Sequence, residues 1–485
     1  MSELSQLSPQ PLWDTFATIC SIPHPSYHEE QLAAHITAWA SEQGFWNERD
    51  QVGNILIRKP ATQGYENLKP VALQAHLDMV PQKNNDTVHD FTQDPIQPWV
   101  DGEWVKARGT TLGADNGIGM ASALAVLADN SLQHGPLEVL LTMTEETGMT
   151  GAFGLQPGWL QADILINTDS EEEGEIYMGC AGGVDFTSTQ VLTHQAVPSD
   201  YQTVKLTLKG LKGGHSGCDI HLGLGNANKL LARFLFSHAQ QLDLRLIDFN
   251  GGTLRNAIPR EAYVALAVSS QHLDKLKSVA AGYLLTLQHE LGLIEKNIAL
   301  VVEDIAHAPQ ALDATSRDAF IALLNSMPNG VIRHSDVMKG VVETSLNVGV
   351  VKIDGDEAKI NCLIRSLIDS GKHYVVDMLT ALSQLAGAQT LARGSYPGWQ
   401  PDGSSPVMAL VRETYEQLFH KTPSIQVIHA GLECGLFREP YPEMDMVSIG
   451  PTITGAHSPD EQVHIASVGL YWQLLTALLK AIPVK

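Results

Sequence analysis

Apolar runs alternate with helical stretches from the start of the chain through residue 167. Apolar residues recur at helical spacing within residues 10–45, and residues 120–128 form a helical stretch rich in Ala, Val and Leu. The predicted strands of this part are the short apolar runs 54–58, 71–75, 137–143 and 163–167. Apolar strands separated by helices predict an α/β domain whose mixed sheet is covered by helices on both faces.

The pattern changes after residue 185, where strands alternate between apolar and polar residues, as half-exposed strands do. The predicted strands of this region are 203–210, 262–268, 344–350 and 360–366, with a helix at 226–241. Because strands and helices do not alternate regularly here, we expect an inserted α+β domain.

The inserted domain is expected to end in the turn-rich segment 394–399. A helix at 406–419, strands near 425–429 and 446–450, and a helix at 465–482 follow it. We therefore expect a discontinuous first domain, residues 1–187 and 397–485, interrupted by a second domain at 188–396.

Composition narrows the class of protein. A chain of 485 residues is too long for one ordinary core, and its net charge of −23 argues against nucleic acid or an anionic membrane as a partner. The five cysteines are scattered and form no Cys-x-x-Cys pair, so we expect buried free thiols and neither a disulfide framework nor a thiolate zinc site. Residues 1–6 lack the features of a signal peptide, and no apolar run approaches the ~18 residues that span a bilayer. These features predict a cytoplasmic protein.

Candidate chemistry begins at the end of the strand 71–75, with His76 and Asp78. Alternate residues of a strand point the same way, so the two side chains share a face. A carboxylate that accepts the second ring N–H of a metal-binding histidine orients that ring. The alternative is that both are surface polar residues at a strand end.

Acidic residues also follow other predicted strands or turns. Asp115 lies in a glycine-rich turn before a helix, where it could instead serve as a helix cap. A phosphate loop is disfavoured there, since no Gly-Lys-Ser/Thr follows. Glu145 and Glu146 follow the strand 137–143, so one can bind a metal while the other faces its water. The alternative for the pair is a solvated acidic loop.

Two further residues extend this pattern. Asp169 follows the strand 163–167, whereas the three glutamates 171–173 are expected in solvent. His457 lies in a Gly- and Pro-bounded loop, with His464 as its nearby competitor. Histidine and carboxylate ligands without cysteine suit a hydrolytic pair of zinc ions with an open position for water.

These motifs, in this order, resemble the motif set of the aminoacylase/carnosinase family of di-zinc metallopeptidases, and the likeness runs essentially from end to end. The matching motifs are His76-x-Asp78, Gly113-Ala114-Asp115-Asn116, Glu145-Glu146, Asp169 and His457. The resemblance implies a zinc-peptidase catalytic domain with an inserted lid domain.

The resemblance also implies a ligand set. One zinc would bind to His76 and Asp169 and the other to Glu146 and His457, with Asp115 as the bridge. By the same likeness Glu145 would be the general base and Asp78 would orient the first histidine. A cis peptide bond would follow the bridging aspartate.

The inserted domain carries marks of the family's lid. Gly213-Gly214-His215-Ser216-Gly217 resembles the lid motif whose histidine reaches the partner subunit's site in dimeric relatives, which implies a homodimer through the lid. Asn256 and Arg365 resemble lid residues that hold the substrate, Arg365 through a bidentate pair with its carboxylate. Otherwise His215 is a surface histidine in a turn and Arg365 an ordinary strand-face charge.

The function implied is hydrolysis of unblocked dipeptides of broad sequence, Xaa-His peptides included, with two Zn²⁺ per chain that Co²⁺ or Mn²⁺ could replace. Asp169, rather than a glutamate, at the third ligand position resembles the aminopeptidase and dipeptidase branch. The alternatives are an N-acyl amino acid deacylase and a non-catalytic peptide-binding protein on the same fold. The glycine-rich loop 429–435, which contains Glu433, has no role assigned from sequence.

Overall fold

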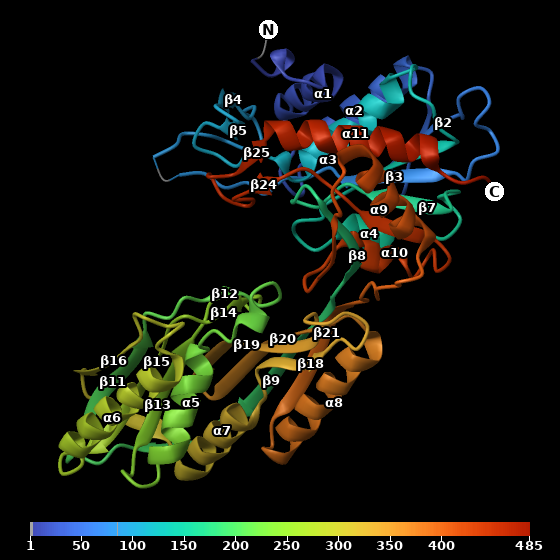
Figure 1. Ribbon diagram of the computed structural model, residues 1–485. Coiled ribbons are helices and arrows are strands. Elements are labelled where there is room, and N and C mark those ends of the chain that lie inside the picture. Colours follow the sequence, from blue (N-terminus) through green and yellow to red (C-terminus); the bar gives the residue numbers. More distant parts are fainter. Residues whose placement is uncertain (1–2, 85) are drawn as a thin grey trace. The chain divides into compact units, whose positions relative to one another are not determined.

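A computed structural model describes residues 3–84 and 86–485. The chain divides into two compact units, which Figure 1 colours along the sequence. The first unit comprises Met1–Gly179, Pro401–Val427 and Leu432–Lys485, and the second comprises Cys180–Gln400 and Ile428–Gly431. The first unit is therefore assembled from segments far apart in the sequence.

The first unit is built on an eight-stranded mixed sheet with the order β1-β2-β6-β3-β7-β23-β8-β22. Its strands are β1 (Trp46–Arg49), β2 (Ile55–Lys59), β3 (Val71–His76), β6 (Leu137–Thr142), β7 (Ile164–Asn167), β8 (Glu175–Cys180), β22 (Ser424–Ile428) and β23 (Asp445–Ser448). The four adjacent strands β6, β3, β7 and β23 are parallel. Their carboxyl ends meet at one edge, where open α/β sheets usually bind ligands.

Helices cover both faces of this sheet. They are α1 (Gln10–Cys20), α2 (Glu30–Glu42), α3 (Ala114–Ala128), α4 (Thr150–Gly154), α9 (Pro406–Phe419), α10 (Glu433–Phe437) and α11 (Ile465–Ala481), preceded by a short 3₁₀ helix, Glu3–Gln6. On one face, alternate strand residues such as Leu73 and Val139 share a core with Phe16 of α1 and Ile118 of α3. The intervening strand residues are buried as well, and α4 and α10 lie on that side in Figure 1.

A small four-stranded sheet adjoins this core within the first unit. Its strands, in the order β24-β25-β5-β4, are β24 (Ile453–Thr454), β25 (Gln462–His464), β5 (Trp104–Ala107) and β4 (Pro98–Asp101). Because β24 and β25 pair antiparallel, residues 455–461 form a closed hairpin loop.

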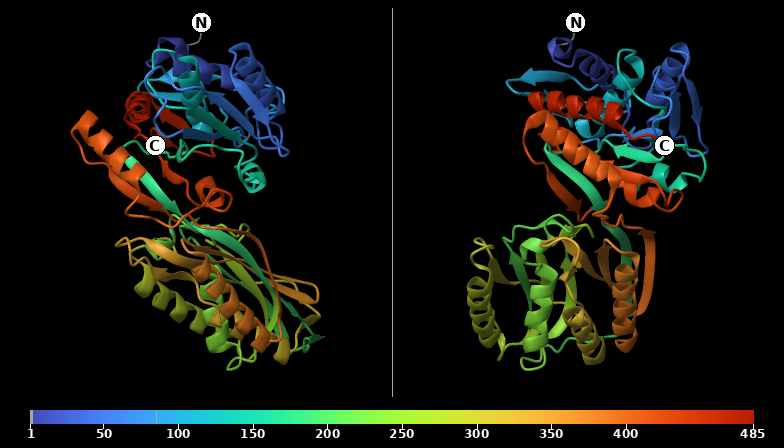
Figure 2. Two further views of the ribbon diagram at one scale, coloured as in Figure 1. Left: turned by 90° about the vertical axis from the view of Figure 1, so that its right-hand side faces the viewer. Right: turned by 45° about the vertical axis from the view of Figure 1, so that its right-hand side comes forward.

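The second unit is a two-layer α+β structure. In the described part of the chain its main sheet has nine strands, which pair antiparallel. They are β9 (Gly182–Val191), β11 (Tyr201–Lys209), β13 (Arg245–Gly251), β15 (Ala262–Ser269), β16 (Ala299–Asp304), β18 (Gly330–His334), β19 (Val342–Asp354), β20 (Glu357–Ser366) and β21 (Gln389–Tyr396). Figure 2 shows the helices of the unit along one face of this sheet. They are α5 (Ala227–His238), α6 (Leu273–Leu291), α7 (Ala314–Ser326) and α8 (Asp369–Leu385).

Two short ribbons and a turn of 3₁₀ helix complete the second unit. The ribbons pair β10 (His194–Ala196) with β17 (Gln310–Leu312) and β12 (Gly214–His215) with β14 (Ala257–Ile258), and the 3₁₀ turn is Ile220–Leu222. The apolar core of the unit lies between the main sheet and its helices, with Phe234, Phe249 and Phe320 among its fully buried side chains.

The fold class predicted from sequence is confirmed, and most predicted elements lie within a few residues of the observed ones. The helix predicted at 406–419 is α9 (Pro406–Phe419), and the strand predicted at 344–350 is the longer β19. Two expectations are wrong. Residues 394–396 belong to strand β21, whose pairing with β9 continues past an irregularity, and the Cys218 thiol is exposed, whereas the other four are buried. Among the described residues, no helix is long and apolar enough to span a bilayer.

Close packing of α3 against the β7 loop gives a test of this arrangement. A Cβ added at Gly119 would lie 2.5 Å from the backbone oxygen of Thr168 and 2.7 Å from Oδ1 of Asn116. We expect Gly119→Ala to destabilise the first unit by about 1–3 kcal/mol, measured as the shift of its thermal unfolding transition. The matched control is Gly282→Ala in α6, where an added Cβ meets nothing within 4 Å. This substitution should raise the stability of the protein by about 0.5–1 kcal/mol, because alanine has a higher helix propensity than glycine. Unchanged stability of Gly119→Ala would contradict the packing described.

Candidate metal centre

Three neighbouring parallel strands deliver polar side chains to one edge of the sheet. His76 is the last residue of β3, Glu145 and Glu146 follow β6, and Asp169 lies two residues beyond β7. The register places His76 level with the last residue of β6, so these side chains start from the same height. The strand ends therefore bring one histidine and three acids together.

Two further side chains reach this edge from other elements. Asp115 lies in the first turn of α3, and His457 lies in the loop between β24 and β25. Asp115 has extended backbone angles rather than helical ones, and the peptide bond that follows it is cis, as the family resemblance implies. His457 has a φ of 64°, in the left-handed region that side chains other than glycine rarely adopt. Both side chains are thus presented by unusual backbone.

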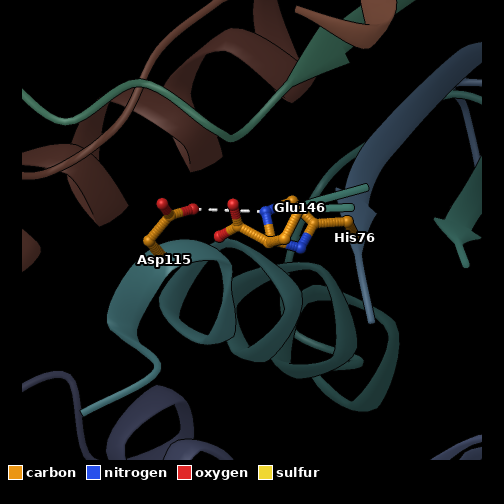
Figure 3. A group of neighbouring side chains, drawn as sticks. All are labelled: His76, Asp115 and Glu146. Atoms are coloured by element: carbon orange, nitrogen blue, oxygen red, sulfur yellow. Dashed lines mark hydrogen bonds and ion pairs between the residues drawn. The ribbon is translucent and has the colours of Figure 1, made fainter. Parts of the chain in front are cut away.

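Asp115 lies between the two histidines. Its Oδ1 is 3.2 Å from Nε2 of His76, and its Oδ2 is 3.1 Å from Nε2 of His457. In Figure 3, the side chains of His76, Asp115 and Glu146 gather beside α3, and they can offer ligand atoms that lie within 4.8 Å of one another. One carboxylate therefore faces two imidazoles with separate oxygens.

The remaining acids divide between the two histidines. Asp169 Oδ1 lies 3.4 Å from Nε2 of His76, and Glu146 Oε2 lies 3.0 Å from Nε2 of His457. Glu145 is farther out, with Oε2 4.0 Å from Nε2 of His76. The six residues form two histidine–acid pairs that share Asp115, with Glu145 beside them.

Asp78 lies on the opposite side of the His76 ring. Its carboxylate is 3.3 Å from Nδ1, and its carbonyl oxygen is 2.9 Å from the same nitrogen. The carboxylate also accepts hydrogen bonds from the backbone N–H groups of Glu145 and Glu146, at 2.8 and 3.2 Å, and from the Ser26 hydroxyl at 2.7 Å. Asp78 therefore leaves Nε2 of His76 facing the other acids. The alternative of a surface strand end is wrong, because His76 and Asp78 are each 1% exposed.

The pKa values of the clustered acids are set mainly by burial and by the charges of their neighbours. Burial, reinforced by neighbouring acids, raises the pKa of Glu146 to about 7 and that of Asp169 to about 6. Burial likewise raises the pKa of Glu145 well above its usual value. Burial would also raise the pKa of Asp115, but hydrogen bonds from His457 and His76 hold it below its usual range.

The pKa values of both histidines are raised as well, here by the neighbouring acids. Hydrogen bonds to Asp115 and Glu146 raise the pKa of His457 to about 11. Burial alone would lower the pKa of His76, but the charge of Asp169 and the hydrogen bond to Asp115 raise it well above its usual value. Without other cations, protons on the histidines and acids compensate the charge of this cluster.

The donor set fits a pair of divalent cations. Oε1 of Glu146 is a buried oxygen that accepts no hydrogen bond from the described residues, as expected of an atom that awaits a cation. Two imidazoles and several carboxylates, with no thiolate, suit Zn²⁺, Mn²⁺ or Co²⁺. His464, the competitor of His457, instead packs its ring 4.9 Å from that of Trp104.

The three predicted lid residues lie in the second unit. His215 is in β12, Asn256 is exposed one residue before β14, and Arg365 is in β20 and only 5% exposed. The Arg365 guanidinium donates to the Tyr396 hydroxyl at 3.2 Å and lies 3.4 Å from Nε2 of His215. Among the residues that the structure describes, no carboxylate pairs with Arg365. An ordinary exposed strand-face charge is therefore excluded for this arginine.

Two buried acids near the site received no role from sequence. Glu433, at the start of α10, is fully buried, and its Oε2 accepts hydrogen bonds from Gln74 at 2.6 Å and Thr142 at 2.7 Å. Burial raises the pKa of Glu433 to about 8. Glu461 follows His457 by four residues and binds the loop that carries Asp115. Their partners lie 291 to 359 residues away in the chain, so no local pattern could have revealed these contacts.

Comparison with known proteins adds independent findings. The model of "Peptidase family M20/M25/M40" matches residues 72–481. The chain is 75% identical, over the full length of both proteins, to the cytosol non-specific dipeptidase of Escherichia coli strain K12. Its structure matches that of the aminoacylhistidine dipeptidase from Vibrio alginolyticus with a TM-score of 0.91 and 61% identity, covering 100% of this chain and 99% of that one. The aminopeptidase PepT of Bacillus cereus shares the fold, with a TM-score of 0.62 and 15% identity, at 98% and 99% coverage.

The raised pKa values predict how metal binding depends on pH. At pH 7 the metal-free protein holds a proton on His457, whose pKa is about 11, and part of one on Glu146, whose pKa is about 7. Metal ligands must be deprotonated, so binding of Zn²⁺ should release about one proton or more per chain, and affinity should rise with pH. Calorimetric titration of the metal-free protein with Zn²⁺, in two buffers of different ionisation enthalpy, measures this release. Heats that are independent of the buffer would contradict it.

Proposed function

The chain belongs to the M20/M25/M40 family of peptidases, and on that premise we propose that it is a metal-dependent dipeptidase acting on unblocked dipeptides. The observation that carries the proposal is the placement of Asp115, which turns one oxygen toward each of two histidine–acid pairs. The likeness to two named dipeptidases supports the same reading. We further propose that the protein works in the cytoplasm, following the relative named for the cytosol.

The proposed site would hold two Zn²⁺ ions, for which Co²⁺ or Mn²⁺ could substitute. His76 and Asp169 would hold one ion, Glu146 and His457 the other, and Asp115 would bridge them. Bound there, the ions would polarise the peptide carbonyl and lower the pKa of the attacking water. The buried Oε1 of Glu146, which accepts no hydrogen bond from the described residues, supports this assignment.

Glu145 is the proposed general base. Its carboxylate is beside the metal ligands but is assigned to neither ion, and burial makes it a stronger base than a solvated glutamate. It would take the proton from the attacking water and deliver it to the leaving amine. Asp78 would keep Nδ1 of His76 protonated and Nε2 directed at the metal, a positioning role.

The second unit would recognise the substrate. Arg365 is a nearly buried cation without an acidic partner among the described residues, which suits pairing with the dipeptide's carboxylate. Asn256 would contact the substrate, and His215 would stabilise the oxyanion. Following the family resemblance, we propose that residues 188–396 also form a homodimer in which His215 serves the other copy's site.

A substrate panel tests the function. We expect the metal-loaded protein to cleave free dipeptides, Xaa-His peptides included, in preference to N-acetylated ones. C-terminally amidated versions should be cleaved at least about tenfold less well, since the lost charge removes the proposed contact with Arg365. Chelation should abolish the activity and Zn²⁺ should restore it. Preference for the acetylated substrates would instead identify an N-acyl amino acid deacylase, and loss of turnover on every substrate would leave a peptide-binding protein.

Substitution of Glu145 tests the general base. Glu145→Gln should lower kcat by about 10²–10⁴-fold because the amide cannot accept the proton, while the metal content stays near that of the unmodified protein. The matched control is Glu172→Gln, an exposed acid that follows the β7 strand end, which should leave kcat unchanged. Metal analysis and steady-state kinetics on the same preparations decide the point. Near-normal kcat in Glu145→Gln would remove this residue from the chemistry.

A further inference from the structure

Glu461 joins the two loops that carry Asp115 and His457. The residue is only 2% exposed, and its carboxylate accepts four backbone hydrogen bonds. Oε2 accepts from Leu112 at 2.8 Å and Gly113 at 3.0 Å, and Oε1 accepts from Ala114 at 2.8 Å and Asp115 at 3.2 Å. Both oxygens are thus fully used by one short stretch of backbone.

The side chains of Leu112 and Ala114 are buried in the core, but the backbone N–H groups of this stretch still need acceptors. The residue before α3 is Gly113, with a φ of 71°, and it provides no side-chain cap for the helix. The first N–H groups of a helix need an acceptor, and here Glu461 supplies it from 346 to 349 residues away. Because Asp115 itself is not helical, the regular hydrogen bonds of α3 do not fix its backbone.

The backbone of Glu461 is also held in place. It immediately precedes β25, and its N–H donates to the carbonyl of Ser458 at 3.0 Å within the hairpin loop. Ser458 in turn donates to Gly455 at 3.2 Å, so the loop that presents His457 is folded onto itself. A shift of Glu461 would therefore move the Asp115 backbone relative to the His457 loop.

We infer that Glu461 is a positioning residue of the metal centre, whose carboxylate fixes Asp115 relative to His457 and so preforms the metal position shared by these two ligands. The inference rests on the proposed two-metal site. In this role Glu461 contacts neither the metal ions nor the substrate. Residues that orient metal ligands typically contribute 10–100-fold to metal affinity.

The test compares two isosteric variants. In Glu461→Gln, an NH₂ group replaces one oxygen, so two of the backbone N–H groups face a donor and lose their acceptor. The control is Glu138→Gln, because Glu138 is also buried and accepts backbone hydrogen bonds from Gln161 and Ala162 at 2.8 and 2.9 Å. Glu138 lies near the start of β6, at the other end of that strand from Glu145 and Glu146. It therefore reports the effect of disturbing a buried backbone-bound carboxylate away from the metal centre.

Zn²⁺ affinity of each metal-free protein is measured by competition with a chromophoric chelator, together with its melting temperature and the visible spectrum of its Co²⁺ form. We expect Glu461→Gln to bind one of two Zn²⁺ ions about 10–100-fold more weakly and to change the Co²⁺ spectrum. Glu138→Gln should lower the melting temperature without changing either affinity.

Unchanged affinities in Glu461→Gln, or equal weakening of both ions that follows the melting temperature as in Glu138→Gln, would overturn the inference. A third variant, Glu461→Asp, retains the charge on a shorter side chain and should restore part of the affinity if the carboxylate matters. If the unmodified protein binds fewer than two Zn²⁺ ions, the proposed site and the inference fall together. If the unmodified protein binds two Zn²⁺ ions and cleaves dipeptides, and Glu461→Gln binds both Zn²⁺ ions with normal affinity, only the inference about Glu461 fails.

Discussion

The arrangement of the first unit depends on holding like charges together out of water. Asp115, Glu145, Glu146 and Asp169 converge at one edge of the sheet, and burial combined with mutual repulsion raises the pKa values of the latter three. Ionised carboxylates in such a place are costly unless cations or hydrogen bonds compensate them. The two histidines compensate part of the charge, and divalent cations would compensate more. The rest of the unit keeps these groups from moving apart.

Buried carboxylates that accept hydrogen bonds from backbone N–H groups help to hold these segments together. Asp78 ties the backbone of Glu145 and Glu146 to the ring of His76, and Glu461 ties the start of α3 to the hairpin loop. The second unit uses the same device, since Glu295 accepts N–H groups from Lys212 and Gly225 on either side of the His215 segment. An acid of this kind does not react. It joins irregular segments that helices and sheets leave unsupported.

Part of the site could be predicted from local sequence patterns, whereas contacts between residues far apart in the chain could not. Parallel strands end at one edge, so His76, Glu145, Glu146 and Asp169 could be expected to meet from hydrophobic pattern alone. Asp115 and His457 could be placed at the site only through the family's ordered motifs, because the sequence of a turn or hairpin loop does not show where its side chains point. The structure brings both to the same cluster. Glu461 and Glu433 stayed without roles, since each is defined by partners hundreds of residues away. Strand β21 was not predicted, and Gly394 and Pro397 signal a turn where pairing with β9 carries the strand to Tyr396.

The position of β23 in the sheet has a consequence for synthesis of the chain. β23 (Asp445–Ser448) lies between β7 and β8, although it follows them by more than 260 residues. A ribosome must therefore complete the second unit before it produces the strand that fills the gap in the first. Contacts of such long sequence separation form slowly, because a large loop must close before they gain any stability. His457 and Glu461 emerge later still, so the four acids lack the histidine that pairs with Asp115 and Glu146 until nearly the whole chain has been made.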